Sequence, residues 1–261
     1  MTSSLAWVLS LCLLGSFISI GAASGYLLLP KLIREKTLDY LICFAIGMLL
    51  GAGFLHLLPE AIDQAGDSTH GIMRAAVSAI LAFFILEKGL IWRHHHHHHH
   101  DSRQVHEHEI ETQSGRHAGP LILVGDSVHN FLDGVLIASA FLADFSLGVV
   151  TALAVIAHEI PQELGDFAIL IKSGYSRSRA LFYNLLTSVA MIIGATLAWF
   201  WLSEFSGLIP YLLTFTAASF IYVAVSDLMP TLNSKVGLKA TAIQVFLIGA
   251  GLVLNGMIHV G

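Results

Sequence analysis

The sequence predicts an all-α polytopic membrane protein with eight transmembrane helices. Of its 261 residues, 55% are hydrophobic and only 12% are charged, whereas a soluble domain carries about 25% charged residues. The mean hydropathy is +0.74. Eight apolar stretches follow one another along the chain, and each can cross about 30 Å of hydrocarbon as an α-helix. We therefore expect a lipid bilayer around the protein and no nucleic-acid partner.

The eight expected spans are joined by short connections, with one exception. The first span could instead be a signal peptide, but no Lys or Arg precedes it and its apolar run is too long for one, so we expect a retained helix. The spans lie at residues 5–29, 38–62, 72–92, 120–142, 147–171, 180–202, 208–228 and 240–260.

The basic residues predict the orientation of these spans. All 13 Lys and Arg residues except Arg74 fall in or beside connections on one side of the eight-span arrangement. Lys and Arg concentrate in cytoplasmic loops. We therefore predict a multi-pass plasma (inner) membrane protein with both termini extracytoplasmic and the connection 93–118 in the cytosol.

The fourth and fifth spans carry acids and histidines, although residues 117–171 contain no Lys or Arg. A carboxylate at mid-bilayer costs roughly 2.5–3.5 kcal/mol on insertion scales. Asp133, Glu159 and Glu163 would together cost on the order of 8–10 kcal/mol. Because no basic side chain in these spans can offset this cost, protons, water or a bound metal cation must do so.

A helical projection places these polar residues on two stripes. Asp126, His129 and Asp133 share one arc of the fourth span, together with Asn130, and His129 and Asp133 are i, i+4 neighbours. In the fifth span two pairs have this spacing, His158 with Gln162 and Glu159 with Glu163. The two stripes are expected to face each other. Pro161 removes a backbone donor there, so a kink is expected beside the polar groups.

These residues form two motifs, HNFLDG at 129–134 and HEIPQELGDF at 158–167. Both resemble motifs of the ZIP (Zrt/Irt-like) family of divalent-metal transporters, LIV-1/GufA-like bacterial type. The resemblance implies a 3+2+3 arrangement, with an inverted repeat around central helices four and five, and a homodimer. It also implies a set of metal ligands: His129, Asn130, Asp133, His158, Glu159 and Gln162, with Glu163 as an adjacent candidate. Gln162 departs from the LIV-1-type pattern, which has His there.

The spans group into four segments: transmembrane helices one to three at 1–92, a cytosolic His-rich loop at 93–118, core metal-binding helices four and five at 119–172, and helices six to eight at 173–261. An engineered tag would also explain the histidine run, but its mid-chain position and the further histidines after it argue against one. Such tracts bind transition metals weakly. The loop candidates are His94, His95, His96, His97, His98, His99 and His100.

Other polar residues inside spans are weaker candidates for the transport pathway. These candidates are Asp126, Asp166, His56, Glu60 and Asp227. For His56, Glu60 and Asp227, an interhelical hydrogen bond is at least as compatible as contact to an ion.

The pattern favours a secondary transporter of divalent transition metals, moving them into the cytosol. Imidazole and carboxylate ligands suit zinc first, and also iron, manganese, cobalt or cadmium. The metal is then the substrate, and no catalytic cofactor or enzymatic activity is expected. One alternative is a membrane-embedded zinc hydrolase, because HEIPQ resembles H-E-x-x-H, although Gln162 replaces its second His. Another is a metal sensor without flux.

Overall fold

The protein is described from a computed structural model, which describes residues 2–26, 30–96, 107–202, 204–232 and 237–257. These residues form helices and turns, without a strand among them. In order they are α1 (Thr2–Tyr26), α2 (Lys31–Gly51), the π-helix η1 (Ala52–Leu57), α3 (Leu58–Ala65), the 3₁₀ turn η2 (Gly66–Ser68), α4 (Thr69–His96), α5 (Glu107–Ala143), α6 (Phe145–Lys172), α7 (Arg177–Leu202), the 3₁₀ turn η3 (Ser206–Leu208), α8 (Ile209–Tyr222), the π-helix η4 (Val223–Leu228), α9 (Met229–Leu232) and α10 (Leu238–Gly256).

These elements make eight helical rods, which confirms the predicted all-helical membrane architecture. The second rod is α2, η1 and α3 in continuous succession, and the seventh is α8, η4 and α9. Within the described residues, six helices are long and apolar enough to cross a membrane, and α4 adds the shorter apolar stretch Thr69–Ile85. The remaining rod, α5, carries the polar motif of the predicted fourth span.

The helix limits differ from the predicted spans mainly around the His-rich connection. Helix α4 continues to His96, and α5 already begins at Glu107. Hydrophobicity sets only the length that must lie in lipid, and a helix can extend into water beyond it. Residues 97–106, including His97 to His100, lie outside the described residues. The division into four segments stays a prediction.

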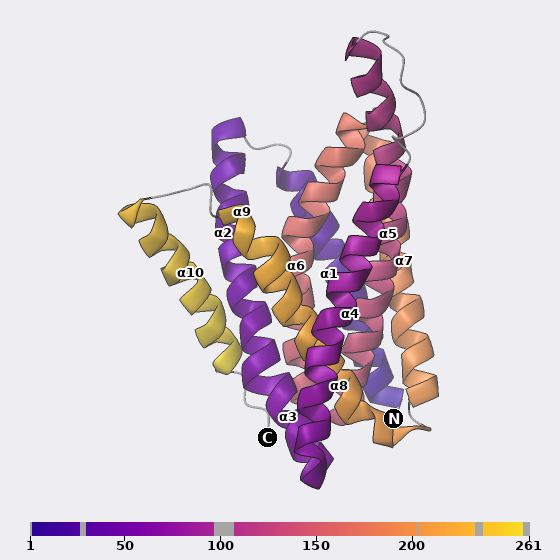
Figure 1. Cartoon of the computed structure of the whole chain (residues 1–261), viewed down its shortest axis with the longest axis vertical. Helices are drawn as coiled ribbons and strands as arrows, with labels where there is room; N and C mark the ends of the chain where they lie inside the picture. The colour runs from indigo at the N-terminus through magenta and orange to yellow at the C-terminus, as the bar shows by residue number, and fades with distance from the viewer. Residues whose placement is uncertain (1, 27–29, 97–106, 203, 233–236, 258–261) are drawn as a thin grey trace.

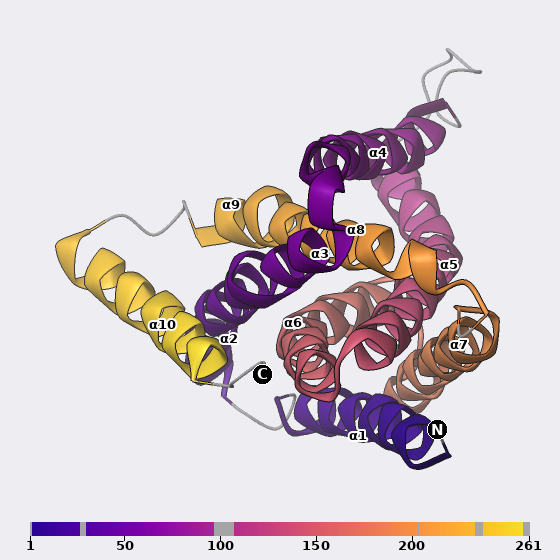
Figure 2. The same ribbon diagram turned by 90° about the horizontal axis from the view of Figure 1, so that it is seen from below.

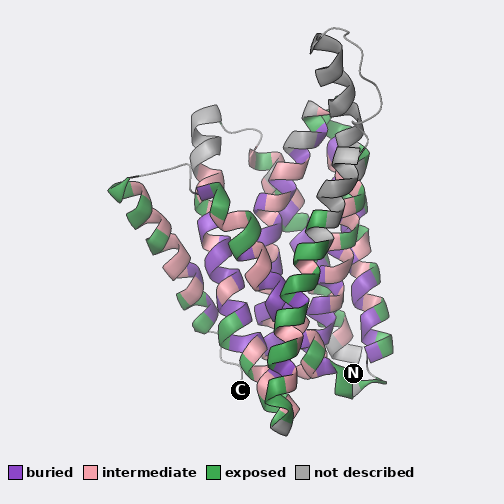
Figure 3. Ribbon diagram, in the orientation of Figure 1, coloured by how far each residue is buried: buried purple, intermediate pink, exposed green. Residues whose placement is uncertain are grey.

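The α5–α6 pair lies inside a ring of other helices (Figures 1 and 2). Helices α1 and α2 pack on α6, whereas α7 and α8 pack on α5. Helix α4 lies outside α8, and α10 lies outside α2. Buried residues concentrate between the rods in the middle of the bundle (Figure 3), so the predicted polar stripes lie in its interior.

Two glycines bring α5 and α7 into backbone contact. A Cβ atom added to Gly134 on α5 would lie 1.9 Å from the carbonyl oxygen of Met191. One added to Gly194 on α7 would lie 2.1 Å from the carbonyl oxygen of Phe131. Small residues allow this close approach between membrane helices. The contact holds the motif-bearing part of α5 against α7.

A proline lies two residues after the end of each π-helix. Pro59 and Pro230 have no N–H to give to the carbonyl four residues earlier. The residue before each proline instead reaches five residues back, from Leu58 N to Gly53 O and from Met229 N to Ala224 O. The second and seventh rods thus both contain a π-helix just before a proline. This likeness agrees with the predicted repeat, which relates the first three helices to the last three.

Substitution of Gly134 tests the α5–α7 contact. Gly134→Ala forces the two backbones apart, and overpacking of this kind costs about 1–3 kcal/mol. We expect a lower Tm of the purified protein in detergent. Gly125→Ala on the same helix is the control, because its Cβ would meet nothing within 4 Å. An equal Tm for both variants would contradict the close contact.

Candidate metal centre

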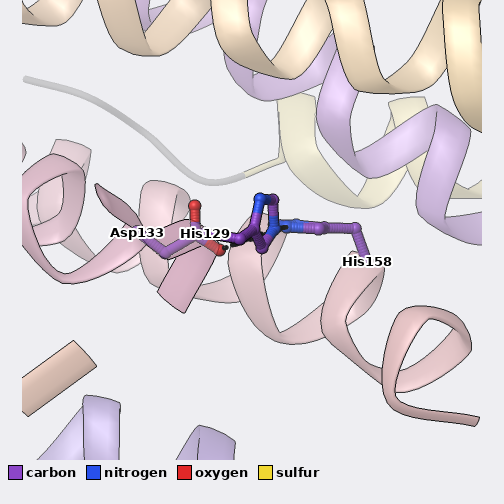
Figure 4. Close-up of side chains that lie close together, drawn as sticks. All are labelled: His129, Asp133 and His158. Atoms are coloured by element: carbon purple, nitrogen blue, oxygen red, sulfur yellow. Dashed lines mark hydrogen bonds and ion pairs between the residues drawn. The ribbon is translucent and has the colours of Figure 1, made fainter. Parts of the chain in front are cut away.

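Three side chains from α5 and α6 converge in the interior (Figure 4). The Nε2 atoms of His129 and His158 lie 3.1 Å apart. Asp133 Oδ2 lies 3.4 Å from His129 Nε2 and 3.2 Å from His158 Nε2. Among the described residues, these are the only three His, Cys, Asp or Glu side chains whose ligand atoms all lie within 4.8 Å of one another. We call them the histidine site.

Helical spacing and one backbone bond position this site. His129 and Asp133 lie side by side because they are one turn apart on α5. On α6, His158 Nδ1 lies 3.1 Å from the carbonyl oxygen of Ala154. A carbonyl only accepts, so Nδ1 donates, and in the neutral ring Nε2 then presents its lone pair to the site.

The histidine site is also electron-rich and nearly closed to solvent. Asp133 and His158 are only 2% and 1% exposed, whereas His129 is 26% exposed along its side chain. Lone pairs on two imidazoles and a carboxylate repel one another unless a proton or a cation lies between them. Two imidazoles and a carboxylate are ligands that Zn²⁺ takes at about 2.0–2.2 Å.

The other predicted ligands lie around this site without joining it. Glu159 follows His158 on α6. Its side chain is buried and lies close enough to Asp133 for the two charges to interact. Asn130 is buried and donates Nδ2 to Asp126 Oδ1 at 2.9 Å. Gln162 is half-buried, and its Nε2 lies 3.5 Å from the same Asp126 oxygen, so it faces Asp126.

The fourth of these residues, Glu163, is buried and reaches a third helix. Its Oε2 accepts a hydrogen bond from Asn184 Nδ2 on α7. Asp126 is buried too, and Asp166 is half-buried within electrostatic range of Asp126. The predicted residues therefore divide into the histidine site and a second group around Asp126 and Glu163.

The remaining pathway candidates occupy other places. His56 Nε2 lies 3.0 Å from the carbonyl oxygen of Asn255 on α10. Half-buried Glu60 accepts a hydrogen bond from Gln64 at 2.8 Å, and Asp227 is exposed on η4. Residues 94–96 end α4, and the structure describes no side chains there.

Sequence reasoning did not connect α7 with the carboxylates of α6. Asn184 is 1% exposed, and its backbone carbonyl also accepts hydrogen bonds from Thr187 and Ser188. An Asn inside an apolar span was the available signal. The sequence does not show which helix lies beside α6, so the signal could not be connected to Glu163.

The fold and this centre define a class, that of polytopic membrane proteins with a buried metal-ligand cluster between two central helices. The family model described as ZIP zinc transporter matches residues 4–90 and 87–258, and the chain belongs to this family. Members of the family are transporters and not enzymes, which removes the hydrolase alternative.

Several curated relatives are similar over most of the chain. The zinc transporter zipt-7.2 of Caenorhabditis elegans is 30% identical over 92% of this chain and 63% of the relative. The zinc transporter ZIP13 of Pongo abelii is 31% identical over 83% and 65%. An uncharacterized zinc transporter of Schizosaccharomyces pombe is 29% identical over 79% and 59%. The matches thus span roughly three fifths of the length of these relatives.

The position of His56 leads to a prediction that separates packing from metal contact. His56→Ala removes the hydrogen bond to Asn255, which is worth about 1 kcal/mol. We expect a lower Tm with zinc affinity unchanged within about twofold. His70→Ala, at the exposed start of α4, is the control for removing a histidine. Weaker zinc binding at unchanged Tm would instead place His56 in the pathway.

Proposed function

We propose that the chain is a secondary transporter that moves divalent transition-metal ions, zinc first, across the membrane into the cytosol through the histidine site. The observation that carries the proposal is the convergence of His129, Asp133 and His158 between the two central helices. Zinc is the first choice because of this ligand set and because the relatives are named zinc transporters. Iron, manganese, cobalt and cadmium suit the same ligands less selectively.

The surroundings of the histidine site favour a site for passage. Zinc takes about four ligands, and the described trio supplies three. Asn130, Glu159 and Gln162 lie one residue or one turn from the trio in sequence, so they are the nearest candidates for the fourth ligand. A weak fourth ligand suits a transporter, because an ion must bind well enough to enter and weakly enough to leave.

The orientation of the chain belongs to the same proposal. The one-sided Lys and Arg distribution places both termini outside the cytosol and the connection 93–118 inside it. We place the protein in the plasma (inner) membrane as a homodimer, as the family resemblance implies. The histidines of the connection, His94 to His100, would retain or buffer metal ions after release.

Cysteine labelling tests the orientation. Glu204, in the turn after α7, and Ser178, in the first turn of α7, are both exposed and lie at opposite ends of this helix, whereas the native Cys12 and Cys43 are buried. We expect Glu204→Cys to react with an impermeant thiol reagent on intact cells, and Ser178→Cys to react only after permeabilisation. The reverse pattern would invert the topology.

Removal of a primary ligand tests the route of the ion. We expect His158→Ala and Asp133→Ala to lower radiolabelled zinc uptake into proteoliposomes by about tenfold or more, since two remaining ligands hold the ion poorly. Glu204→Gln, an exposed change of one charge, is the control. Uptake at the wild-type rate in both ligand variants would refute transport through this site.

Substitution of Gln162 tests whether this residue is a metal ligand or a packing residue. As a ligand, the neutral amide binds zinc more weakly than an imidazole does. Gln162→His is then expected to tighten zinc binding by about tenfold and to slow release. Zinc titration of the purified protein, beside uptake kinetics, measures both effects. A lower Tm with unchanged zinc affinity would assign Gln162 to packing.

A further inference from the structure

Helix α1 has a small polar face that borders the histidine site. Cys12, Ser16 and Ser19 are 0%, 4% and 0% exposed, and their spacing of three and four residues places them on one side of the helix. Cys12 lies within electrostatic range of Glu159 and Asp133. The polar face of α1 is therefore close to the site, although α1 contributes none of its three side chains.

The contact between α1 and α6 determines which of their residues lie at the same level. A Cβ atom added to Gly15 on α1 would lie 2.9 Å from Cγ1 of Ile156 on α6. The two helices run in the same direction (Figure 1), so residues about one turn further along each also lie side by side. Ser19 follows Gly15 by four residues. Glu159 follows Ile156 by three. The Ser19 hydroxyl accordingly lies next to the Glu159 carboxylate.

The Ser19 hydroxyl differs from those of two neighbouring serines on α1. Ser16 Oγ donates to the carbonyl oxygen of Cys12 at 3.0 Å, and Ser24 Oγ donates to that of Ile20 at 2.8 Å. A helical serine commonly donates to the carbonyl four residues earlier in this way. Ser19 Oγ is buried and forms no hydrogen bond within the described residues. Its donor is therefore not used by its own helix.

Glu159 is the buried carboxylate that this hydroxyl can serve. It is 2% exposed, and the ion pairs among the described residues join Asp133 to the two imidazoles and leave Glu159 without one. A buried hydroxyl and a buried carboxylate each cost free energy when they lack a partner. A carboxylate that binds a cation is ionised, and an ionised carboxylate is the stronger hydrogen-bond acceptor. A bound ion therefore favours a hydrogen bond between Ser19 and Glu159.

From these observations we propose that Ser19 is a positioning residue, whose hydroxyl donates a hydrogen bond to Glu159 when a divalent ion occupies the histidine site. One carboxylate oxygen of Glu159 then accepts from Ser19, and the other faces the ion as a ligand. The inference rests on the proposed function and deepens it, because it assigns α1 the task of orienting a ligand on α6. Groups that hydrogen-bond a metal ligand from behind fix its orientation, and their loss typically weakens binding by about 10–100-fold.

Zinc titration of the purified full chain tests the role of the hydroxyl. Ser19→Ala is expected to weaken zinc binding by about tenfold, because Glu159 loses the donor that orients it. Ser19→Thr keeps the hydroxyl and is expected to retain most of the wild-type affinity. Ser16→Ala is the matched control, since Ser16 lies on the same buried face but serves its own helix, and its zinc affinity is expected to stay unchanged. The His-rich tract is the same in every variant.

A double-mutant cycle shows whether Ser19 acts through Glu159. Glu159→Ala is expected to weaken zinc binding by itself. Adding Ser19→Ala to Glu159→Ala is then expected to change the affinity no further, because the hydroxyl has no carboxylate left to orient. Additive losses in the double variant would overturn the inference, since they mean that Ser19 acts independently of Glu159. Unchanged zinc affinity in Glu159→Ala would overturn it as well.

A second substitution covers the case in which Ser19→Ala does not fold. Ser19→Cys replaces the hydroxyl by a thiol, which is a weak donor, and is expected to weaken zinc binding in the same direction. A lower Tm with wild-type zinc affinity in the Ser19 variants that fold would assign Ser19 to packing and refute the positioning role.

Zinc flux into proteoliposomes separates this inference from the proposed function. If the wild type transports zinc while Ser19→Ala binds zinc as tightly as the wild type does, only the role of Ser19 is refuted. If the wild type moves no zinc, the transport proposal fails, whatever the binding data show.

Discussion

The structure depends on acidic side chains buried where no basic side chain can neutralise them. Residues 117–171 contain neither Lys nor Arg, yet Asp126, Asp133, Glu159 and Glu163 are all buried there. A buried charge without a partner is strongly destabilising. Among the described residues, the ion pairs of these acids are those of Asp133 with the imidazoles of His129 and His158, and two imidazoles cannot serve four carboxylates. A cation or bound protons must therefore complete the interior.

Packing around α5 and α6 makes this burial possible. Gly134 and Gly194 let α5 and α7 approach to backbone contact, which carries Asn184 to the side of α6 where it reaches Glu163. On the far side of the bundle, His56 and Asn255 tie α10 to the second rod, and this frame surrounds the central pair without adding charge to it.

Much of the fold was predictable because the bilayer imposes one length on each crossing. Apolar length and the Lys/Arg pattern gave eight rods, and i, i+4 spacing placed His129 beside Asp133. Helix extension at α4 and α5 was not predictable, since lipid places no limit on a helix in water. The residue that a given side chain contacts on another helix was not predictable either. The sequence shows His56 and Gln162 as polar residues in apolar spans, but only the neighbours of each helix decide that one contacts α10 and the other Asp126.

The separation of the predicted ligands into two groups follows from helix geometry as well. On one helix, residues three and four apart share a face, so a polar stripe of eight residues extends over about two turns, or 11 Å. A single ion coordinated at about 2 Å cannot contact both ends of such a stripe. A motif that is continuous in sequence must therefore act as successive positions along the helix axis. On α6 the imidazole of His158 lies at one end of the stripe and the carboxylates of Glu163 and Asp166 lie toward the other, so the ligand chemistry changes along this helix.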